Sequence, residues 1–244
     1  MTSAGRFVDL ASEIQSLVDG DTEAIGPELL PVRLCKAAAR ALDVDGASLS
    51  LFTGPDMRVP VGASDDVATF AERLQFTLGQ GPCFQAQSSG QMVFAVERLL
   101  SGAWPEYHHA LLAHTPFHAV LSVPLDQGLQ GMGALDLYFR EPDGMDDMDI
   151  ADIGAVARTV TSLLTDMPHD RGEGSAPAWL ENSAVERRAQ VWIAMGMLNT
   201  RYHLNSSDAL ALLRGYSFAR NRTVDETAGD LSHRRLSVEE LLGA

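Results

Sequence analysis

Lysine is almost absent from this sequence, and arginine supplies nearly all of its positive charge: Lys36 is the only lysine among 18 basic residues. Acidic residues outnumber basic ones by 33 to 18, which gives a net charge of −15. This excess lies in residues 1–177, whereas residues 178–244 hold equal numbers of arginine and acidic residues. An acidic chain is a poor general binder of nucleic acid, but a local arginine cluster still acts within a Debye length of about 8 Å.

Cysteine is also scarce, with only Cys35 and Cys83. Two cysteines exclude a disulfide framework and a cysteine zinc site, and they indicate free thiols in a reducing compartment. No apolar run reaches the roughly 20 residues that a membrane-spanning helix needs. The N-terminus also lacks the basic flank and apolar stretch of a secretory signal. We therefore expect a cytoplasmic protein that does not bind a membrane.

The first two thirds of the chain have the patterns of an α+β fold. Apolar spacing of three and four residues predicts helices, and alternation predicts strands. The expected helices are Arg6–Asp19, Glu28–Leu42, Asp65–Phe76, Trp104–His114 and Asp149–Leu164. The expected strands are Ala47–Thr53, Met57–Val61, Gln91–Val96, Ala119–Leu125 and Gly133–Phe139, and Leu78–Pro82 is expected to form a tight loop. Strands interrupted by helices predict a largely antiparallel sheet with helices packed on it.

The last third has helical spacing throughout, after a Gly-, Pro- and charge-rich segment that is typical of a linker. Helices are expected over Trp179–Tyr202 and Asn205–Arg220. A third short helix should begin at Thr223, because Thr223 and Glu226 have the spacing of a capping box, and Ser237 with Glu240 repeats it for a final turn. The expected organisation is an N-terminal helix over 1–27, an α+β domain over 28–166, a linker over 167–178 and an all-α domain over 179–244.

One run in the helical part has a family pattern. The steps Ala194-Met195-Gly196, Ala209 to Leu213-Arg214, Asn221-Arg222 and Ala228 follow in order between Val191 and Leu231. This run resembles the ANTAR family, which implies a three-helix RNA-binding domain. Family members usually have lysine where this chain has Met195.

The α+β part carries a second pattern. Its motifs are Leu78–Cys83, Trp104-Pro105, Ser122–Leu125 and Gly133–Tyr138, in that order within Glu28–Leu164. They resemble the GAF sensors that are fused to ANTAR domains in actinobacterial proteins. The resemblance implies a sheet with packed helices and a pocket for a small-molecule ligand, but it identifies no cofactor or ligand.

Two groups of residues are candidate sites. Spacing alone favours a solvated helix end for the cations at the end of the second predicted helix and in the following turn. The ANTAR resemblance instead implies that they bind hairpin loops of nascent transcripts, whose phosphates and unstacked bases suit arginine and asparagine. The candidate RNA-binding residues are Arg214, Arg220, Asn221, Arg222 and Thr223. A coiled-coil-like stripe at Val191, Met195, Leu198 and Tyr202 predicts a homodimer interface.

Other motifs favour structural interpretations. The Gly-x-Gly of Leu78–Cys83 lacks the lysine of nucleotide loops, and no visible cation or helix start activates Cys83. His108, His109, His114 and His118 lie close in sequence, which leaves a haem or metal sensor as a minority alternative. The acidic run of residues 143–149 lacks the distal glutamate of a calcium loop. No catalytic arrangement stands out, so we expect no enzyme.

These patterns together predict a signal-responsive, RNA-binding transcription antiterminator in which the GAF part gates dimerisation or exposure of the ANTAR part. The ANTAR resemblance implies that it would hold a double-hairpin RNA and so prevent a terminator stem from forming. The alternatives are a ligand-sensing dimerisation module with weakened RNA binding, favoured by Met195, and a haem or small-molecule sensor.

Overall fold

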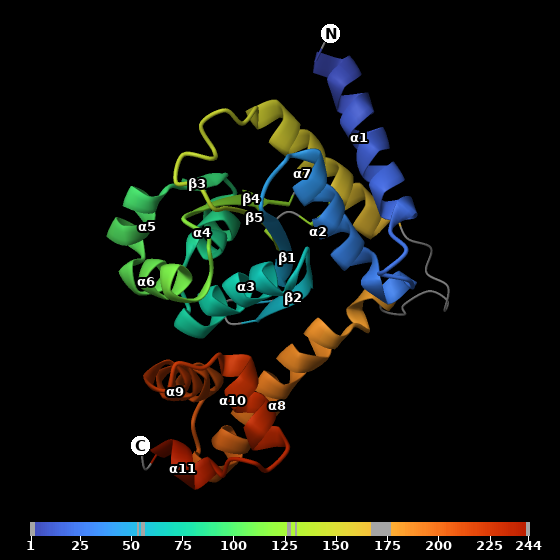
Figure 1. Cartoon of the computed structure of the whole chain (residues 1–244). Helices are drawn as coiled ribbons and strands as arrows, with labels where there is room; N and C mark the ends of the chain where they lie inside the picture. Colours follow the sequence, from blue (N-terminus) through green and yellow to red (C-terminus); the bar gives the residue numbers. More distant parts are fainter. Residues whose placement is uncertain are drawn as a thin grey trace.

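The computed structural model describes residues 3–52, 54, 57–125, 128–129, 131–166 and 177–242, with side chains described from residue 9 to residue 241. Within these ranges the chain forms a sheet with packed helices, which we call the sheet domain (residues up to 166), and a helical domain (residues from 177) below it (Figure 1). Most of the expected linker, over 167–178, lies outside the described residues.

The sheet has five strands in the order β2-β1-β5-β4-β3, and all four pairings are antiparallel, as predicted. The strands are β1 (Gly46–Phe52), β2 (Arg58–Ala63), β3 (Val93–Ala95), β4 (Ala119–Pro124) and β5 (Gly133–Phe139). Nearly every residue of β1, β2, β4 and β5 is buried, because helices cover both faces of the sheet.

One face packs against α2 (Leu30–Ala41), preceded by the short helix η1 (Pro27–Leu29), and α7 (Ile150–Thr165), and α1 (Ser3–Gly20) packs on α2 and α7. The other face packs against α3 (Asp66–Leu78), α4 (Pro82–Ser89) and α6 (Pro105–His114), with α5 (Glu97–Ala103) beside α6 (Figure 1). Ile14 and Val18 of α1 lie in the main core, so α1 shares the core of the sheet domain.

The sequence did not predict helices α4 and α5. The α4 segment is half polar and has no apolar stripe of helical period, so only its boundaries carry a signal. Gly79 ends α3 in the left-handed conformation with φ 67°, and Pro82 opens α4 at a position where its missing N–H costs nothing. The expected tight loop therefore contains the last residue of α3, three connecting residues and the first residue of α4.

The helical domain begins with the short helix η2 (Ala178–Leu180), followed by α8 (Ser183–Tyr202), α9 (Ser206–Ala219), α10 (Val224–Ser232) and α11 (Val238–Leu242). The first long helix starts four residues later than predicted, because the Asn182 side chain accepts the backbone N–H groups of Ala184 and Val185 as its N-cap. The predicted capping box of Thr223 and Glu226 is confirmed. Among the described residues, no helix is both long enough and apolar enough to cross a membrane.

Each domain contributes an aromatic ring to the core of the other. Trp179 is 5% exposed within the core of the sheet domain, where its indole N–H donates to the Leu164 carbonyl at 3.3 Å. Phe76, at the end of α3, is 1% exposed within the core of the helical domain. The two domains are therefore packed together through exchanged side chains, and α8 also lies along the edge strand β2.

Candidate functional site

Three of the five candidate RNA-binding residues lie against the sheet domain. Arg214 of α9 donates through Nε to the Phe76 carbonyl at 3.0 Å. Asn221 lies in the turn between α9 and α10, with φ 53°, and its side-chain oxygen is 2.9 Å from His114 Nε2 of α6. Thr223 is buried as the N-cap of α10, and the next backbone N–H, of Val224, donates to the Thr77 hydroxyl at 3.0 Å.

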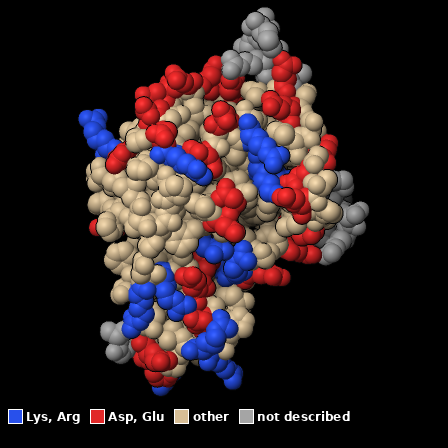
Figure 2. All heavy atoms as spheres, in the orientation of Figure 1, with Lys and Arg blue, Asp and Glu red and all other residues tan. Residues whose placement is uncertain are grey.

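The other two candidates, Arg220 and Arg222, lie closer to solvent. The exposed Arg220 guanidinium stacks 3.8 Å from the Tyr216 ring centroid, and Arg222 pairs with Asp230 at 2.5 Å. Arg222 and Arg235 together lower the pKa of Asp230. In Figure 2 the arginines of the helical domain are interleaved with acidic side chains, whereas acidic side chains predominate at the top of the sheet domain. The structure therefore brings the five candidates to one end of α9 but divides them between covered and exposed positions.

The predicted dimerisation stripe lies inside the helical domain. Val191, Met195 and Leu198 are buried against α9, α10 and α11, and Tyr202 is half-buried there. Packing within one chain accounts for the coiled-coil-like spacing, so the stripe does not offer a free face to a second copy. The exposed face of α8 instead carries Ile193 and Gly196. The homodimer stays a prediction, and Leu198→Glu cannot test it because a buried carboxylate would unfold the domain.

Phe76 lies between two arginines of the helical domain. The Arg188 guanidinium of α8 lies 3.5 Å from the centroid of the Phe76 ring, and that of Arg214 lies 5.3 Å from it. A guanidinium over an aromatic face is attracted by the ring quadrupole, and this attraction grows when the pair is shielded from water. Phe76 therefore joins α3 to α8 and α9 through both apolar burial and charge.

A buried ion network runs from the middle of the sheet to the helical domain. Arg58 of β2 lies 3.3 Å from Asp136 of β5 and 3.5 Å from Glu72 of α3. Glu72 lies 3.6 Å from Arg188, which pairs with Asp225 of α10 at 2.9 Å. All five side chains are at most 3% exposed. Because every link depends on a neighbour from another element, a shift of α3 alters contacts at both ends.

The sequence did not point to this network. Arg58 is completely buried, and its carbonyl accepts a hydrogen bond from Arg188 at 2.5 Å. One signal was present: Asp136 is a single carboxylate within the otherwise apolar strand Gly133–Phe139. Such a residue needs partners, and Ser122 and Gln75 donate to it at 2.5 and 2.8 Å.

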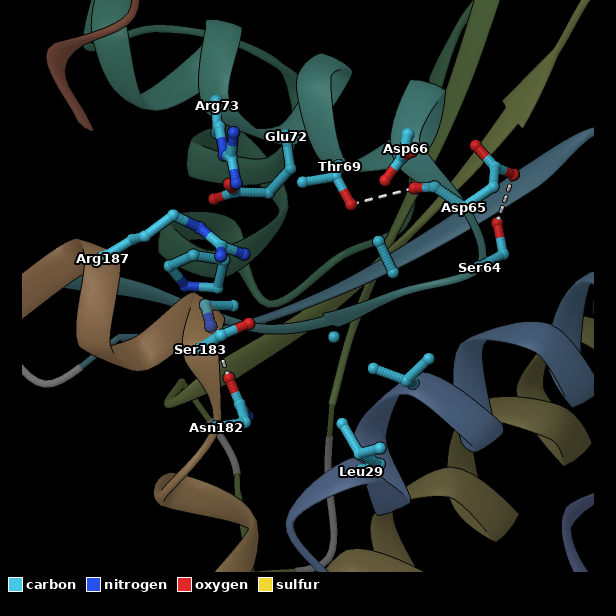
Figure 3. A pocket seen from close by; sticks show the side chains of 15 residues that line it. Leu29, Ser64, Asp65, Asp66, Thr69, Glu72, Arg73, Asn182, Ser183 and Arg187 are labelled. Carbon is cyan, nitrogen blue, oxygen red and sulfur yellow. Dashed lines mark hydrogen bonds between the residues drawn. The ribbon is translucent and has the colours of Figure 1, made fainter. Parts of the chain in front are cut away.

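Polar side chains thus fill the sheet face below α3 and α4. Burial raises the pKa of Asp136 in spite of Arg58 and its hydrogen bonds. The Arg58 guanidinium also lies 5.2 Å from the Phe84 ring centroid and 5.8 Å from that of Phe52. A separate cavity of about 210 Å³ opens at the junction of the two domains, between α2, β2, α3 and α8 (Figure 3).

Cys83 has both of the activating features that the sequence did not reveal. It is the second residue of α4, and the Arg58 cation lies near it. Burial nevertheless dominates and raises the pKa of the Cys83 thiol well above its ordinary value. Burial also raises the pKa of Cys35.

We therefore predict that neither thiol reacts in the folded protein. Only a thiolate attacks a disulfide reagent, and here both thiols are kept protonated and are at most 1% exposed. Treatment with an aromatic disulfide at pH 8 should label neither cysteine on the timescale of minutes, whereas the protein in denaturant should be labelled at both. Rapid labelling of Cys83 in the folded protein would contradict this prediction and would favour a sensor that responds through this thiol.

The four clustered histidines do not converge. His108 and His118 approach opposite oxygens of Glu97 at 3.7 and 3.8 Å, whereas His114 faces Asn221. In the part of the chain that the structure describes, no three His, Cys, Asp or Glu side chains form a group that could hold a metal ion. In the run of residues 143–149, the Asp149 side chain caps α7 by accepting the Ala151 N–H at 2.8 Å.

The GAF-domain family model matches residues 32–165, which is more than half of the chain. A solved GAF domain of a phosphoenolpyruvate-protein phosphotransferase from Coxiella burnetii is 15% identical, with a TM-score of 0.46, and the match covers 66% of this chain and 94% of that one. The corresponding domain from Acinetobacter is 11% identical, with a TM-score of 0.45 and coverage of 65% and 92%.

Free methionine-R-sulfoxide reductase from Neisseria meningitidis, solved with its substrate, is 16% identical, with a TM-score of 0.39 and coverage of 66% and 89%. Among curated proteins, none matches this chain. The family match and the five-stranded antiparallel sheet agree on the same region, and the protein therefore belongs to the GAF domain family.

Proposed function

We propose that this protein is a signal-responsive, RNA-binding transcription antiterminator of the cytoplasm, without catalytic activity, whose GAF domain gates its RNA-binding residues. GAF domains are signal-sensing modules, and here the module is packed against a helical domain. The observation that carries the proposal is the position of the α9–α10 turn. Its candidate RNA-binding residues face α3 and α6 of the sensor, through Phe76, Thr77 and His114.

The exposed side of this turn suits an RNA loop. Arg220 offers a planar cation, and Phe218, two positions before it, is 56% exposed. Aromatic rings and guanidinium planes stack on unpaired bases, and arginine also contacts phosphate. Arg222 is paired with Asp230, so this ion pair must break before Arg222 binds an RNA phosphate.

The side of the turn that contacts the sheet domain explains how a signal would control RNA binding. Arg214 and Asn221 already contact the sensor, so an RNA loop that needs them competes with the sheet domain for the same atoms. A signal that loosens α3 or α6 would release them. Gating then needs no covalent chemistry, only a change in the population of docked and released domains.

The proposed RNA site is tested with the full chain and a double hairpin RNA. The double variant Arg220→Ala, Arg222→Ala should bind about tenfold or more weakly, because stacking on a base is worth about 1–3 kcal/mol. The slope of the log–log salt dependence should also flatten by about 0.7 for each phosphate that the variant no longer neutralises.

The matched control is Arg98→Ala, an exposed arginine on α5 of the sheet domain. If the double variant binds as tightly as this control, the turn does not form the site. If the unaltered chain does not prefer hairpin loops to duplex RNA in conditions that release the domains, the helical domain is better explained as a dimerisation module. Met195 favours that alternative only weakly, because it is buried in the helical core.

A further inference from the structure

The cavity at the domain junction has walls from both domains. Its floor is apolar and comes from Leu29, Val32 and Pro60. One wall is the exposed side of α3, and the opposite wall is the first turn of α8 (Figure 3). This cavity lies at the β2 edge of the sheet, beside the buried ion network rather than within it. Its volume is about 210 Å³, far above the roughly 10–15 Å³ that a single water molecule needs, so it has room for a small molecule.

One end of the cavity is basic. Arg73 of α3 and Arg187 of α8 line it and lie together at one side of the view (Figure 3). Neither arginine has an ion pair with any described residue. Partial burial and the neighbouring Arg73 lower the pKa of Arg187 and outweigh the opposite effect of the Asp225, Glu186 and Asp66 carboxylates. Glu72 does not neutralise this end, because its two oxygens face the buried Arg58 and Arg188.

The other end of the cavity is acidic. Ser64, Asp65 and Asp66 lie there, at the start of α3 (Figure 3). Asp65 is already bonded, since its oxygens accept the Ala68 N–H and the Ser64 hydroxyl. Asp66 is exposed and, within the described chain, has no ion pair. Asp66 and Arg73 are seven residues apart, so they lie on the same side of α3, with Cα atoms about 10 Å apart along its axis.

We propose that this junction cavity binds a small zwitterion of amino-acid size, with its carboxylate on Arg73 and Arg187 and its ammonium group toward Asp66. Two guanidinium groups that form no ion pair with a described residue provide the forked donors that a carboxylate accepts best. A simple anion would gain the same contacts but would also face Asp65 and Asp66, and a simple cation would face the two arginines. Opposite charges at the two ends therefore favour a ligand that carries both.

The position of the cavity gives the ligand a regulatory role, and this step rests on the proposed function. Arg73 belongs to the sensor and Arg187 to the helical domain, so a bound carboxylate bridges the two domains. A ligand that binds only the docked arrangement stabilises it, by an amount that grows with the ratio of the ligand concentration to its Kd. The zwitterion would then hold the α9–α10 turn against the sensor and weaken RNA binding.

Calorimetry on the full chain tests the binding itself. Each of the amino acids found in proteins is titrated separately at millimolar concentrations. Acetate, inorganic phosphate and methylamine serve as probes that carry charge of only one sign. We expect at least one amino acid to bind more tightly than all three probes. Arg187→Gln, which removes an exposed side chain that forms no ion pair with a described residue, should weaken that binding by about tenfold or more, as should Arg73→Gln.

Arg98→Gln is the matched control and should leave the affinity unchanged, while thermal melting confirms that each variant is folded. The proposal is overturned if no amino acid binds, if acetate or phosphate binds as tightly as the best amino acid, or if Arg187→Gln has no effect. RNA titration with and without the bound amino acid then separates the two proposals. Amino-acid binding without an effect on RNA would leave the site intact and contradict only its regulatory role.

Discussion

Replacing Arg188 with methionine should destabilise the protein by about 3–5 kcal/mol, because it leaves buried carboxylates without their cation. Asp225 would lose both of its hydrogen bonds from the guanidinium, and Glu72 would lose one of its two arginines. The Arg58 carbonyl would lose its donor as well. Methionine fills a similar volume, so the cost comes from charge and hydrogen bonding rather than from a cavity. Chemical denaturation with tryptophan fluorescence measures it.

Two further variants identify the cause. Arg187→Met replaces the adjacent arginine of the same helix, which is exposed and has no ion pair with a described residue, so without ligand it should change stability by less than about 0.5 kcal/mol. The double variant Arg188→Met, Asp225→Leu should recover part of the loss, because it removes the stranded carboxylate too. An Arg188→Met protein as stable as the parent would show that the network contributes nothing.

Replacing Phe76 with alanine should separate the two domains and strengthen RNA binding. Truncating a buried phenylalanine costs about 3–5 kcal/mol, and here the loss falls on the core of the helical domain and on the interactions with Arg188 and Arg214. Without this ring, Arg214 loses its cation–π contact with Phe76, so it is held less firmly against α3. Hydrogen exchange should then rise at the end of α3 and at the start of α10, where the Val224 N–H is bonded to Thr77.

The control for Phe76→Ala is Phe94→Ala, which removes a 37% exposed ring from β3 at the far edge of the sheet. This variant should leave both hydrogen exchange in α10 and RNA affinity unchanged. If Phe76→Ala unfolds the helical domain, RNA binding falls instead of rising; Thr77→Val, which removes only the acceptor for Val224, then provides the milder test. A Thr77→Val protein with faster exchange in α10 but unchanged RNA affinity would argue against gating at this contact.

The sequence by itself determined the local structure where its pattern had a clear period. Alternating strands, amphipathic helices and the capping box of Thr223 and Glu226 were all predictable, because each depends on residues a few positions apart. The motifs over Glu28–Leu164 also pointed to the GAF family, which the match over residues 32–165 confirms. Where the pattern was weak, as in the polar helix α4, the same reasoning failed.

Only the tertiary structure decided which face of each element is covered and by what. Arg58 and Arg188 are 130 positions apart and share a hydrogen bond, and Phe76 enters a core whose other members lie beyond residue 190. The stripe of Val191, Met195 and Leu198 has the same spacing whether it packs within one chain or between two. Contacts between distant segments depend on how the whole chain folds. Local periodicity does not predict them, because it reflects only residues a few positions apart.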